Sequence, residues 1–294
     1  MEYILTTDRL TKRYKRCVAA NEVSLHIQKG DIYGIIGKNG AGKTTILKLI
    51  SGLIRPTSGS VNKVCEVGAL IESPGFYPNM TAVQNVKLKL TYCGLEDNGL
   101  SRELITLVGL DPDSGKKAGD FSLGMKQRLG IAMALVGNPE LMVLDEPING
   151  LDPQGIAEIR DIIHKLNKER GITFIIASHI LEELSKTATR YGIVNDGRLI
   201  LELSNEELND RLSEHIILIV DDMAKAYAAL TEKGYTSVKR DEQGRLYVFD
   251  RGAVSSDIVE ILVYAGVKVS SVYKNKESLE EYYISVTTGK GGIR

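Results

Sequence analysis

The sequence predicts an α/β fold over residues 1–215 and a small α+β unit over residues 216–294. Three continuous apolar runs, typical of strands buried on both faces of a parallel sheet, alternate with helical patterns in the first part. In the second part, short strands and helices follow one another in the order βαββαβ. The net charge is −1, so the chain has no overall basic field and we expect no nucleic-acid partner.

The elements before residue 55 are predicted to be strands, a glycine-rich turn and a helix. Residues 23–27 (VSLHI) alternate apolar and polar side chains, which is typical of a half-buried antiparallel strand. Residues 31–37 form a continuous apolar run, which favours a strand buried on both faces. The glycine-rich turn comes next, and the helical pattern covers residues 44–53.

The middle of the chain is predicted to be helical up to a second buried strand. Thr81 and Gln84 have the spacing of a capping box, so a helical region begins there and extends to about residue 110 with one break. A further helix begins near Gly124. Residues 140–147 (ELMVLDEP) then contain the second buried strand.

The third buried strand lies between a helix and a hairpin. Asp152 suits the N-cap of that helix and Pro153 its first position, while Gly171 suits its end. Residues 172–179 (ITFIIASH) form the strand. Residues 191–203 predict a hairpin that turns at an Asn-Asp-Gly sequence.

Cysteine use and hydropathy indicate where the protein works. Cys17, Cys65 and Cys93 have no metal-ligand spacing, and an odd number of scattered cysteines is typical of reduced thiols in a cytosolic protein. The first residues lack a signal-peptide core, and no apolar run approaches the ~20 residues of a membrane span. We therefore expect a cytoplasmic protein that works at a membrane only by docking onto a partner that spans it.

Residues 37–44 (GKNGAGKT) match the pattern G-x-x-x-x-G-K-[ST], between the first buried strand and its helix. Glycines let the backbone wind tightly, so that successive N–H groups point at phosphate oxygens. Lys43 is expected to reach the β- and γ-phosphates of a nucleotide, and Thr44 to ligate Mg²⁺. The alternative is a glycine turn with a surface lysine, but the strand before it and the helix after it favour phosphate binding.

Two acids and a histidine follow the other buried strands, at the edge where ligands bind in open α/β sheets. Asp145 is expected to hold Mg²⁺, and Glu146 to act as general base for the attacking water. His179 is expected to bond the γ-phosphate and orient that water. The alternatives are two acids that cap the next turn and a histidine with a structural role.

Tyr14 and the segment FSLGMKQ (residues 121–127) are further candidates for nucleotide contacts. Tyr14, ahead of the first buried strand, is placed to stack on adenine; the alternative is a surface tyrosine. Ser122 and Gly124 stand at the N-terminal end of a helix, where free N–H groups, the helix dipole and a hydroxyl favour a phosphate. The glycine loop already surrounds that phosphate on one side. The contacts from Ser122 and Gly124 therefore fit best if they come from another copy of the chain.

Taken together, these motifs resemble those of ATP-binding subunits of ABC transporters, over residues 1–215. LMVLDEP resembles the Walker B motif, GLDP with Asp152 resembles the D-loop, and ASH ending at His179 resembles the switch-histidine segment. FSLGMKQR occupies the place of the family signature, usually LSGGQ. The Walker A residues of this chain are Gly37, Lys38, Asn39, Gly40, Ala41, Gly42, Lys43, Thr44 and Thr45.

The resemblance implies a P-loop NTPase (RecA-like) core with an antiparallel β subdomain and an α-helical subdomain, joined here to a ferredoxin-like C-terminal unit. It implies ATP and Mg²⁺ as cofactors, and two cassettes facing head to tail with each ATP between one copy's Walker A and the other copy's signature. It also implies a separate membrane permease, driven by ATP hydrolysis, and a place on the inner face of the cell membrane. We expect the C-terminal unit to be regulatory or to support the dimer.

Two positions depart from the family pattern. The family has a glutamine that contacts Mg²⁺ and senses the permease where this chain has Glu72, which we expect to be a Mg²⁺ ligand. Leu123 replaces a signature glycine and Met125 a glutamine, while Ser122 and Gly124, the expected phosphate contacts, are kept. Leu123 disfavours backbone angles that glycine adopts cheaply, so the motif leaves the detailed shape of the loop open. Glu72 and residues 73–81 (SPGFYPNMT) resemble bacitracin- and lantibiotic-type export or self-protection ATPases, which implies peptide antibiotics or drugs as cargo.

Other classes of function fit the sequence less well. Soluble ABC proteins of translation usually carry two cassettes in one chain, and those of DNA repair carry a long coiled coil between Walker A and the signature. A P-loop kinase or GTPase would not need GLDP or the serine-bearing segment. A regulatory subunit that binds ATP but hydrolyses it weakly stays an alternative, because of Leu123 and Glu72.

Overall fold

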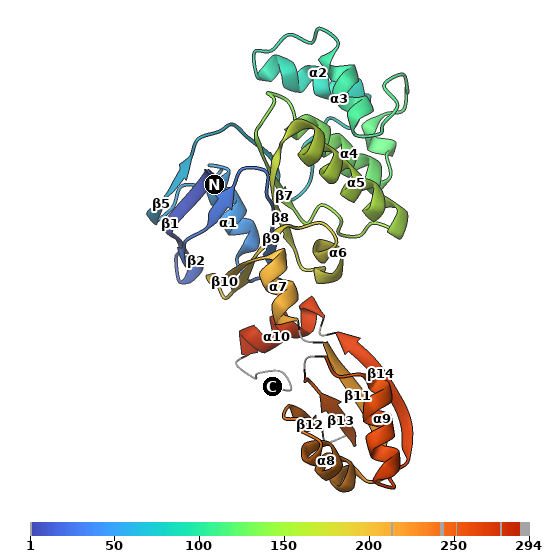
Figure 1. Cartoon of the computed structure of the whole chain (residues 1–294). Helices are drawn as coiled ribbons and strands as arrows, with labels where there is room; N and C mark the ends of the chain where they lie inside the picture. Colours follow the sequence, from blue (N-terminus) through green and yellow to red (C-terminus); the bar gives the residue numbers. More distant parts are fainter. Residues whose placement is uncertain (1, 213, 242–243, 251, 277, 289–294) are drawn as a thin grey trace. The chain divides into compact units, whose positions relative to one another are not determined.

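The computed structural model describes residues 2–212, 214–241, 244–250, 252–276 and 278–288. Contacts divide the chain into two compact units, Met1–Asn205 and Glu206–Arg294 (Figure 1). This boundary lies earlier in the chain than the one expected near residue 215, because most of the helix α7 (Asn205–Arg211) falls in the second unit. Arg211 of this helix donates to the Tyr282 hydroxyl at 3.2 Å.

Strands and helices alternate along the first unit. In chain order they are β1 (Tyr3–Tyr14), β2 (Cys17–Val23), β3 (His26–Gln28), β4 (Ile32–Ile36), α1 (Lys43–Ile50), β5 (Ser58–Lys63), β6 (Val67–Leu70), α2 (Ala82–Tyr92), α3 (Leu100–Leu107), the 3₁₀ turn η1 (Ala118–Asp120), α4 (Leu123–Ala134), β7 (Leu141–Asp145), α5 (Pro153–Arg170), β8 (Thr173–Ser178), α6 (Leu181–Ser185), β9 (Arg190–Asn195) and β10 (Arg198–Ser204).

A six-stranded sheet, in the order β10-β9-β4-β8-β7-β6, forms the centre of the first unit. Strands β9, β4, β8, β7 and β6 are parallel, and β10 runs antiparallel to β9. Strands β4, β7 and β8 are buried along their whole length, as their apolar runs predict. Their carboxyl ends lie side by side, and Gly37, Glu146 and His179 follow these three ends.

A second, antiparallel sheet is formed around β1, which pairs with β2, β3 and β5. The prediction of one strand over residues 23–27 is wrong, because β2 ends at Val23 and β3 begins at His26. Thr7 of β1 explains the break. Its hydroxyl donates to the Val23 carbonyl oxygen and accepts from the Leu25 N–H, both at 2.8 Å, so the backbone stays satisfied between the two strands.

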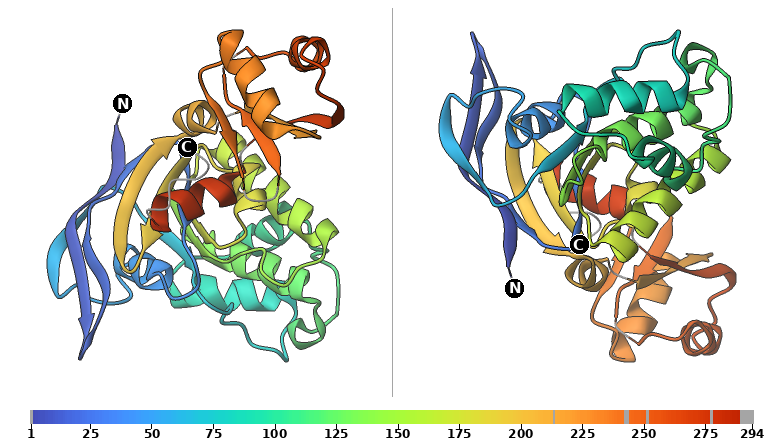
Figure 2. Two further views of the ribbon diagram at one scale, coloured as in Figure 1. Left: turned by 90° about the horizontal axis from the view of Figure 1, so that it is seen from below. Right: turned by 90° about the horizontal axis from the view of Figure 1, so that it is seen from above.

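Helices α2 and α3 (teal) and the antiparallel sheet (blue) lie on different sides of the central strands in Figure 2. The predicted capping box of α2 is confirmed: Thr81 Oγ1 accepts from the Gln84 N–H, and Gln84 Oε1 accepts from the Thr81 N–H. The predicted ends of α5 are confirmed as well. Asp152 caps its first turn, and Gly171 follows its last residue with φ +65°.

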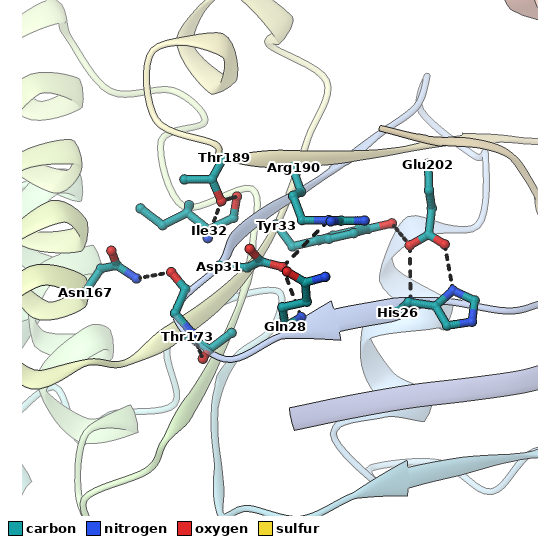
Figure 3. Close-up of polar contacts among 11 residues, drawn as sticks. His26, Gln28, Asp31, Ile32, Tyr33, Asn167, Thr173, Thr189, Arg190 and Glu202 are labelled. Atoms are coloured by element: carbon teal, nitrogen blue, oxygen red, sulfur yellow. Dashed lines mark hydrogen bonds and ion pairs between the residues drawn. The ribbon is translucent and has the colours of Figure 1, made fainter. Parts of the chain in front are cut away.

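A polar network joins the two sheets near the amino end of β4 (Figure 3). The fully buried Tyr33 donates its hydroxyl to Glu202 Oε1 at 2.7 Å, and Glu202 Oε2 lies 2.9 Å from His26 Nδ1. Burial raises the pKa of the Tyr33 phenol well above its usual value, so the hydroxyl stays a donor. The network thus links β3 of the antiparallel sheet to β4 and β10 of the central sheet.

The second unit follows the predicted order βαββαβ. After α7 come β11 (Glu214–Val220), α8 (Met223–Glu232), β12 (Val238–Arg240), β13 (Arg245–Val248), α9 (Ser255–Tyr264), β14 (Val269–Lys276) and α10 (Leu279–Thr288). The strands form an antiparallel sheet in the order β12-β13-β11-β14. Ile216 and Leu218 of β11 pack with Leu230 of α8 and Ile258 of α9 in its core.

None of the helices in the described part of the chain is long and apolar enough to cross a membrane.

Candidate nucleotide-binding site

The loop between β4 and α1 borders a cavity of about 460 Å³. Gly42 has φ +100°, and a Cβ at this position would collide with the Ala19 carbonyl oxygen, so the loop requires glycine here. The first N–H groups of a helix have no partner within the helix, and the first residues of α1 line the cavity, which favours an anion there. Gly37 and Ala41 are buried. The Walker A residues that line the cavity are Lys38, Asn39, Gly40, Gly42, Lys43, Thr44 and Thr45.

A row of polar contacts at this cavity, called the contact row below, joins Lys43 to Glu146 and Glu146 to His179. The Lys43 ammonium, which is buried, donates to the Gly37 carbonyl oxygen at 2.6 Å and lies 3.3 Å from Glu146 Oε1. Glu146 Oε2 lies 2.9 Å from His179 Nδ1 and also accepts from the His179 N–H. Glu146 takes a left-handed conformation with φ +48°, which is costly for a residue with a Cβ. The structure thus brings the two predicted catalytic residues together and ties them to the loop lysine.

Asp145 and Thr44 provide oxygen atoms that fit a magnesium ion. Thr44 Oγ1 donates to Asp145 Oδ2 at 2.8 Å, whereas Asp145 Oδ1 is buried and has no hydrogen-bond partner among the described residues. Burial is the main cause that raises the pKa of the Asp145 carboxyl, and the charge of Glu146 adds to it, while the Thr44 hydrogen bond opposes it. A hydroxyl and a carboxylate oxygen are hard ligands of the kind that Mg²⁺ prefers.

No cluster of three His, Cys, Asp or Glu side chains that would hold a metal by itself occurs in the described ranges. A magnesium ion at Thr44 and Asp145 therefore depends on further oxygen atoms from water and phosphate. This is the usual arrangement for Mg²⁺ in nucleotide sites, where the ion keeps several waters and binds through few protein groups.

Tyr14 lies at the end of β1, opposite Cys17 across the β1–β2 turn. Cys17 lines the cavity, but Tyr14 is not among the lining residues. The Tyr14 ring is about half exposed, and Lys12 Nζ lies 5.2 Å from its centroid. Stacking of Tyr14 on adenine stays a prediction.

Ser122 and Gly124 stand at the N-terminal end of α4, outside the lining of the cavity. Ser122 is the exposed N-cap, and its Oγ accepts from the Met125 N–H at 3.3 Å. Leu123 is the first residue of the helix and does not need the left-handed backbone angles that favour glycine. Asp152 Oδ1 accepts from the Gly155 N–H at 3.1 Å at the start of α5.

Glu72 follows β6 and adopts φ +64°. Its Oε1 accepts from Lys48 Nζ at 2.5 Å, so the expected magnesium ligand is paired with a lysine. The sequence motifs do not indicate Lys48. A signal was present, because Thr44 and Lys48 are four residues apart on one helix and therefore share a face.

The β9–β10 hairpin also supplies lining residues that the motifs did not indicate. Asp196 and Gly197 at its turn line the cavity, and the Gly197 N–H donates to the Ala41 carbonyl oxygen at 2.9 Å. The sequence predicts the hairpin and its turn. Its place beside the glycine loop follows from the pairing of β9 with β4, which no local pattern reveals.

Comparison with known proteins gives the family. The family model described as "ABC transporter" matches residues 20–149. The bacitracin transport ATP-binding protein BcrA of Bacillus licheniformis is 37% identical, over 98% of this chain and 99% of its own length. The chain belongs to the ATP-binding proteins of ABC transporters. The lantibiotic transport ATP-binding protein SrtF of Streptococcus pyogenes is 39% identical to this ABC cassette, over 73% of the chain and 98% of SrtF. The resemblance to bacitracin- and lantibiotic-type ATPases is confirmed.

Solved structures confirm the P-loop NTPase core. A dimeric ATP-binding cassette in a post-hydrolysis state, bound to ADP and Pi, matches with a TM-score of 0.62 at 27% identity. The match covers 68% of this ABC cassette and 98% of that chain. The cassette is therefore the ATP-binding and ATP-hydrolysing subunit of an ABC transporter, and ATPases of this family pair with membrane permeases.

Proposed function

We propose that this ABC cassette hydrolyses magnesium-bound ATP and thereby drives a separate permease that exports peptide antibiotics. The contact row Lys43–Glu146–His179 carries the proposal, because it joins a phosphate-binding lysine to a general base and its positioning histidine. The names of BcrA and SrtF, with bacitracin and lantibiotics as their cargo, support the class of substrate. The intact contact row argues against a regulatory subunit that hardly hydrolyses ATP.

The side chains divide the chemistry among them. Mg²⁺ bound with the nucleotide supplies positive charge next to the phosphate oxygens. Thr44 Oγ1 and Asp145 Oδ1 would hold it. When ATP binds, Lys43 Nζ leaves the Glu146 carboxylate and bonds to phosphate oxygens. The new contact is a charge-assisted hydrogen bond, as the old one was. Glu146 then accepts the proton of the attacking water, while its other oxygen stays bonded to His179.

Ser122, Gly124 and Asp152 act from a second copy of the chain in this proposal. The exposed Ser122 hydroxyl and the N-terminus of α4 provide the two groups that bind phosphate at a helix end. Because these residues are absent from the lining of the cassette's own cavity, a head-to-tail pair gives them a nucleotide to contact. ATP then lies between the two copies.

The permease docks on a second hollow of the first unit, of about 790 Å³. Leu53, Tyr77 and Tyr92 line it with large side chains that are at least half exposed. Ile71 and Ser73, which flank Glu72, also line it. A permease segment in this hollow therefore meets the residues next to the nucleotide site, and it holds the cassette at the inner face of the membrane.

The second unit has the element and strand order of a ferredoxin-like fold, and we assign it to that class. Its contacts make it a compact unit of its own. We propose that it regulates the cassette or supports its dimer.

The substitution Lys43→Ala tests the ATPase proposal. We expect its affinity for a fluorescent ATP analogue with Mg²⁺ to fall about tenfold or more, because a hydrogen bond to a charged group contributes roughly 1.5–3 kcal/mol. Lys186→Ala, which removes a surface lysine paired with Glu183, is the control and should bind like the natural chain. In cells that carry the chain with its permease, Lys43→Ala should also abolish protection against bacitracin. Unchanged affinity of Lys43→Ala would contradict the site, unchanged protection would contradict the coupling of export to ATP, and no protection by the natural chain would contradict the cargo.

A further inference from the structure

Glu72 brings a negative charge to the sheet edge that carries the nucleotide cavity, although it is not itself one of the lining residues. Strands β6 and β7 are parallel neighbours, with Leu70 opposite Leu144, so Glu72 and Asp145 follow adjacent strand ends. The charge of Glu72 is one of the causes that raise the pKa of the Asp145 carboxyl. A carboxylate at this position attracts Mg²⁺ but repels phosphate.

Lys48 is the partner of this carboxylate. Its Nζ donates to Glu72 Oε1 at 2.5 Å. The side chain extends from α1 on the face that also carries Thr44, whose hydroxyl bonds Asp145. The hydrogen bond to Glu72 is the first cause that raises the pKa of the Lys48 ammonium, and the charge of Asp145 also contributes. Lys48 therefore stays charged and lies within electrostatic reach of both acids.

The backbone conformation of Glu72 indicates that the pair has a functional role. Glu72 adopts left-handed angles that cost about 1 kcal/mol for a residue with a Cβ. Its side chain is well exposed at 64%, whereas that of Lys48 is 27% exposed, so packing does not fix the carboxylate. Among the described residues, the ion pair with Lys48 is the side-chain contact that holds the carboxylate.

We propose that Lys48 positions and neutralises Glu72, so that a carboxylate can stand at the nucleotide site without repelling ATP. The inference rests on the proposed ATP site and adds a positioning residue to it. In the paired state the two side chains carry almost no net charge toward the phosphates. Loss of either partner leaves the other charge uncompensated.

The proposal predicts that substitutions of Lys48 and of Glu72 change the affinity for metal-free ATP in opposite directions. Lys48→Gln exposes the negative charge of Glu72, and we expect the affinity for a fluorescent ATP analogue in EDTA to fall about threefold to tenfold. Glu72→Gln leaves the positive charge of Lys48, so the same affinity should rise by a similar factor. The double variant Lys48→Gln/Glu72→Gln should bind like the natural chain, within about twofold.

Magnesium gives a second readout that does not depend on turnover. The ratio of affinities with and without Mg²⁺ should rise in Lys48→Gln, because the freed carboxylate attracts the ion while metal-free ATP is repelled. The ratio should fall in Glu72→Gln. Lys48→Arg keeps the charge and should keep the natural ratio. Because both side chains are partly exposed, all these differences should shrink as the salt concentration rises.

Matched controls and opposing outcomes make the test decisive. Lys29→Gln and Glu140→Gln break an ion pair of similar length, 2.8 Å, and should change neither affinity. A double variant as weak as Lys48→Gln alone would overturn the proposal, because Lys48 would then act without Glu72. Equal weakening by Lys48→Arg and Lys48→Gln would overturn it as well. If the natural chain bound no ATP at all, the proposed ATP site itself would fall; normal binding with failed compensation would count against Lys48 alone.

Discussion

Asp145 illustrates how a single residue of the site opposes the stability of the fold. Its carboxyl is buried, one oxygen has no hydrogen-bond partner among the described residues, and burial raises its pKa. A carboxyl whose pKa is raised by folding favours the folded state when protonated and opposes it when charged. At neutral pH the charge of Asp145 therefore costs stability in the chain without nucleotide.

We predict that Asp145→Asn raises the melting temperature of the nucleotide-free chain at pH 7. A rise of a few degrees is expected, since about 1 kcal/mol shifts a domain of this size by roughly 2–4 °C. The advantage should be full above the raised pKa of Asp145 and should vanish below about pH 4, where the natural carboxyl is protonated. The same variant should lose the extra stabilisation that Mg²⁺ with ATP gives. A lower melting temperature at pH 7 would show that the carboxylate is satisfied in the apo fold.

At the scale of elements, the ends of strands and the beginnings of helices carry the site. Strands β4, β8 and β7 are neighbours, so the glycine loop, His179 and Glu146 meet at one edge. The N-termini of α1 and α4 present the same kind of group, N–H donors without a partner in their own helix backbone, to different surroundings. The first lies in the cavity of its own chain, and the second carries the exposed Ser122.

The substitution Ser122→Arg distinguishes the roles of the N-termini of α1 and α4. A bulky cation at the α4 N-terminus should leave ATP affinity of the isolated chain unchanged within about twofold, while hydrolysis falls about tenfold or more because the second copy cannot close on the phosphates. Binding of a fluorescent ATP analogue and release of phosphate measure the two effects. Ser256→Arg, in the first turn of α9, is the matched control and should alter neither. Collapse of affinity in Ser122→Arg would place Ser122 in the site of its own chain.

Local patterns predict the elements, and contacts between distant segments explain what they miss. The buried strands, the capping box at Thr81 and the glycine loop depend on residues close together in the sequence, so their spacing is sufficient. The Lys48–Glu72 pair requires knowing that β6 lies beside β7, and the lining of the cavity by Asp196 requires knowing that β9 lies beside β4. The break after Val23 depends on the hydroxyl of Thr7, sixteen residues away.

The whole molecule consists of a nucleotide-binding unit and a smaller α+β unit, each with its own core. The family and the cassette fold follow from the first unit. The proposed cycle needs two such chains, because Ser122 and the cavity belong to different parts of one unit. Association of two whole chains on ATP is therefore the property that distinguishes the proposed motor from a chain that binds ATP alone.

Glu146→Gln should trap that association. The amide keeps a contact with His179 but cannot accept the proton of the attacking water, so ATP stays bound and the two copies stay closed. Size-exclusion chromatography with ATP and Mg²⁺ should show a doubled mass, whereas ADP should leave the monomer. Adding Ser122→Arg to the same chain should restore the monomer. A monomer of Glu146→Gln at every ATP concentration, with ATP demonstrably bound, would rule out the two-copy site.

The contacts between His26 and Glu202 also bear on the mechanics of the first unit. Glu202 of the central sheet accepts from the His26 N–H of the antiparallel sheet at 3.1 Å, and its other oxygen lies 2.9 Å from His26 Nδ1. A hinge motion between the two sheets would break both contacts, so we expect the sheets to move together. Any displacement that ATP hydrolysis passes to a permease should therefore arise elsewhere in the first unit. The segments that connect the two sheets to α2 and α3 are the places where we expect it.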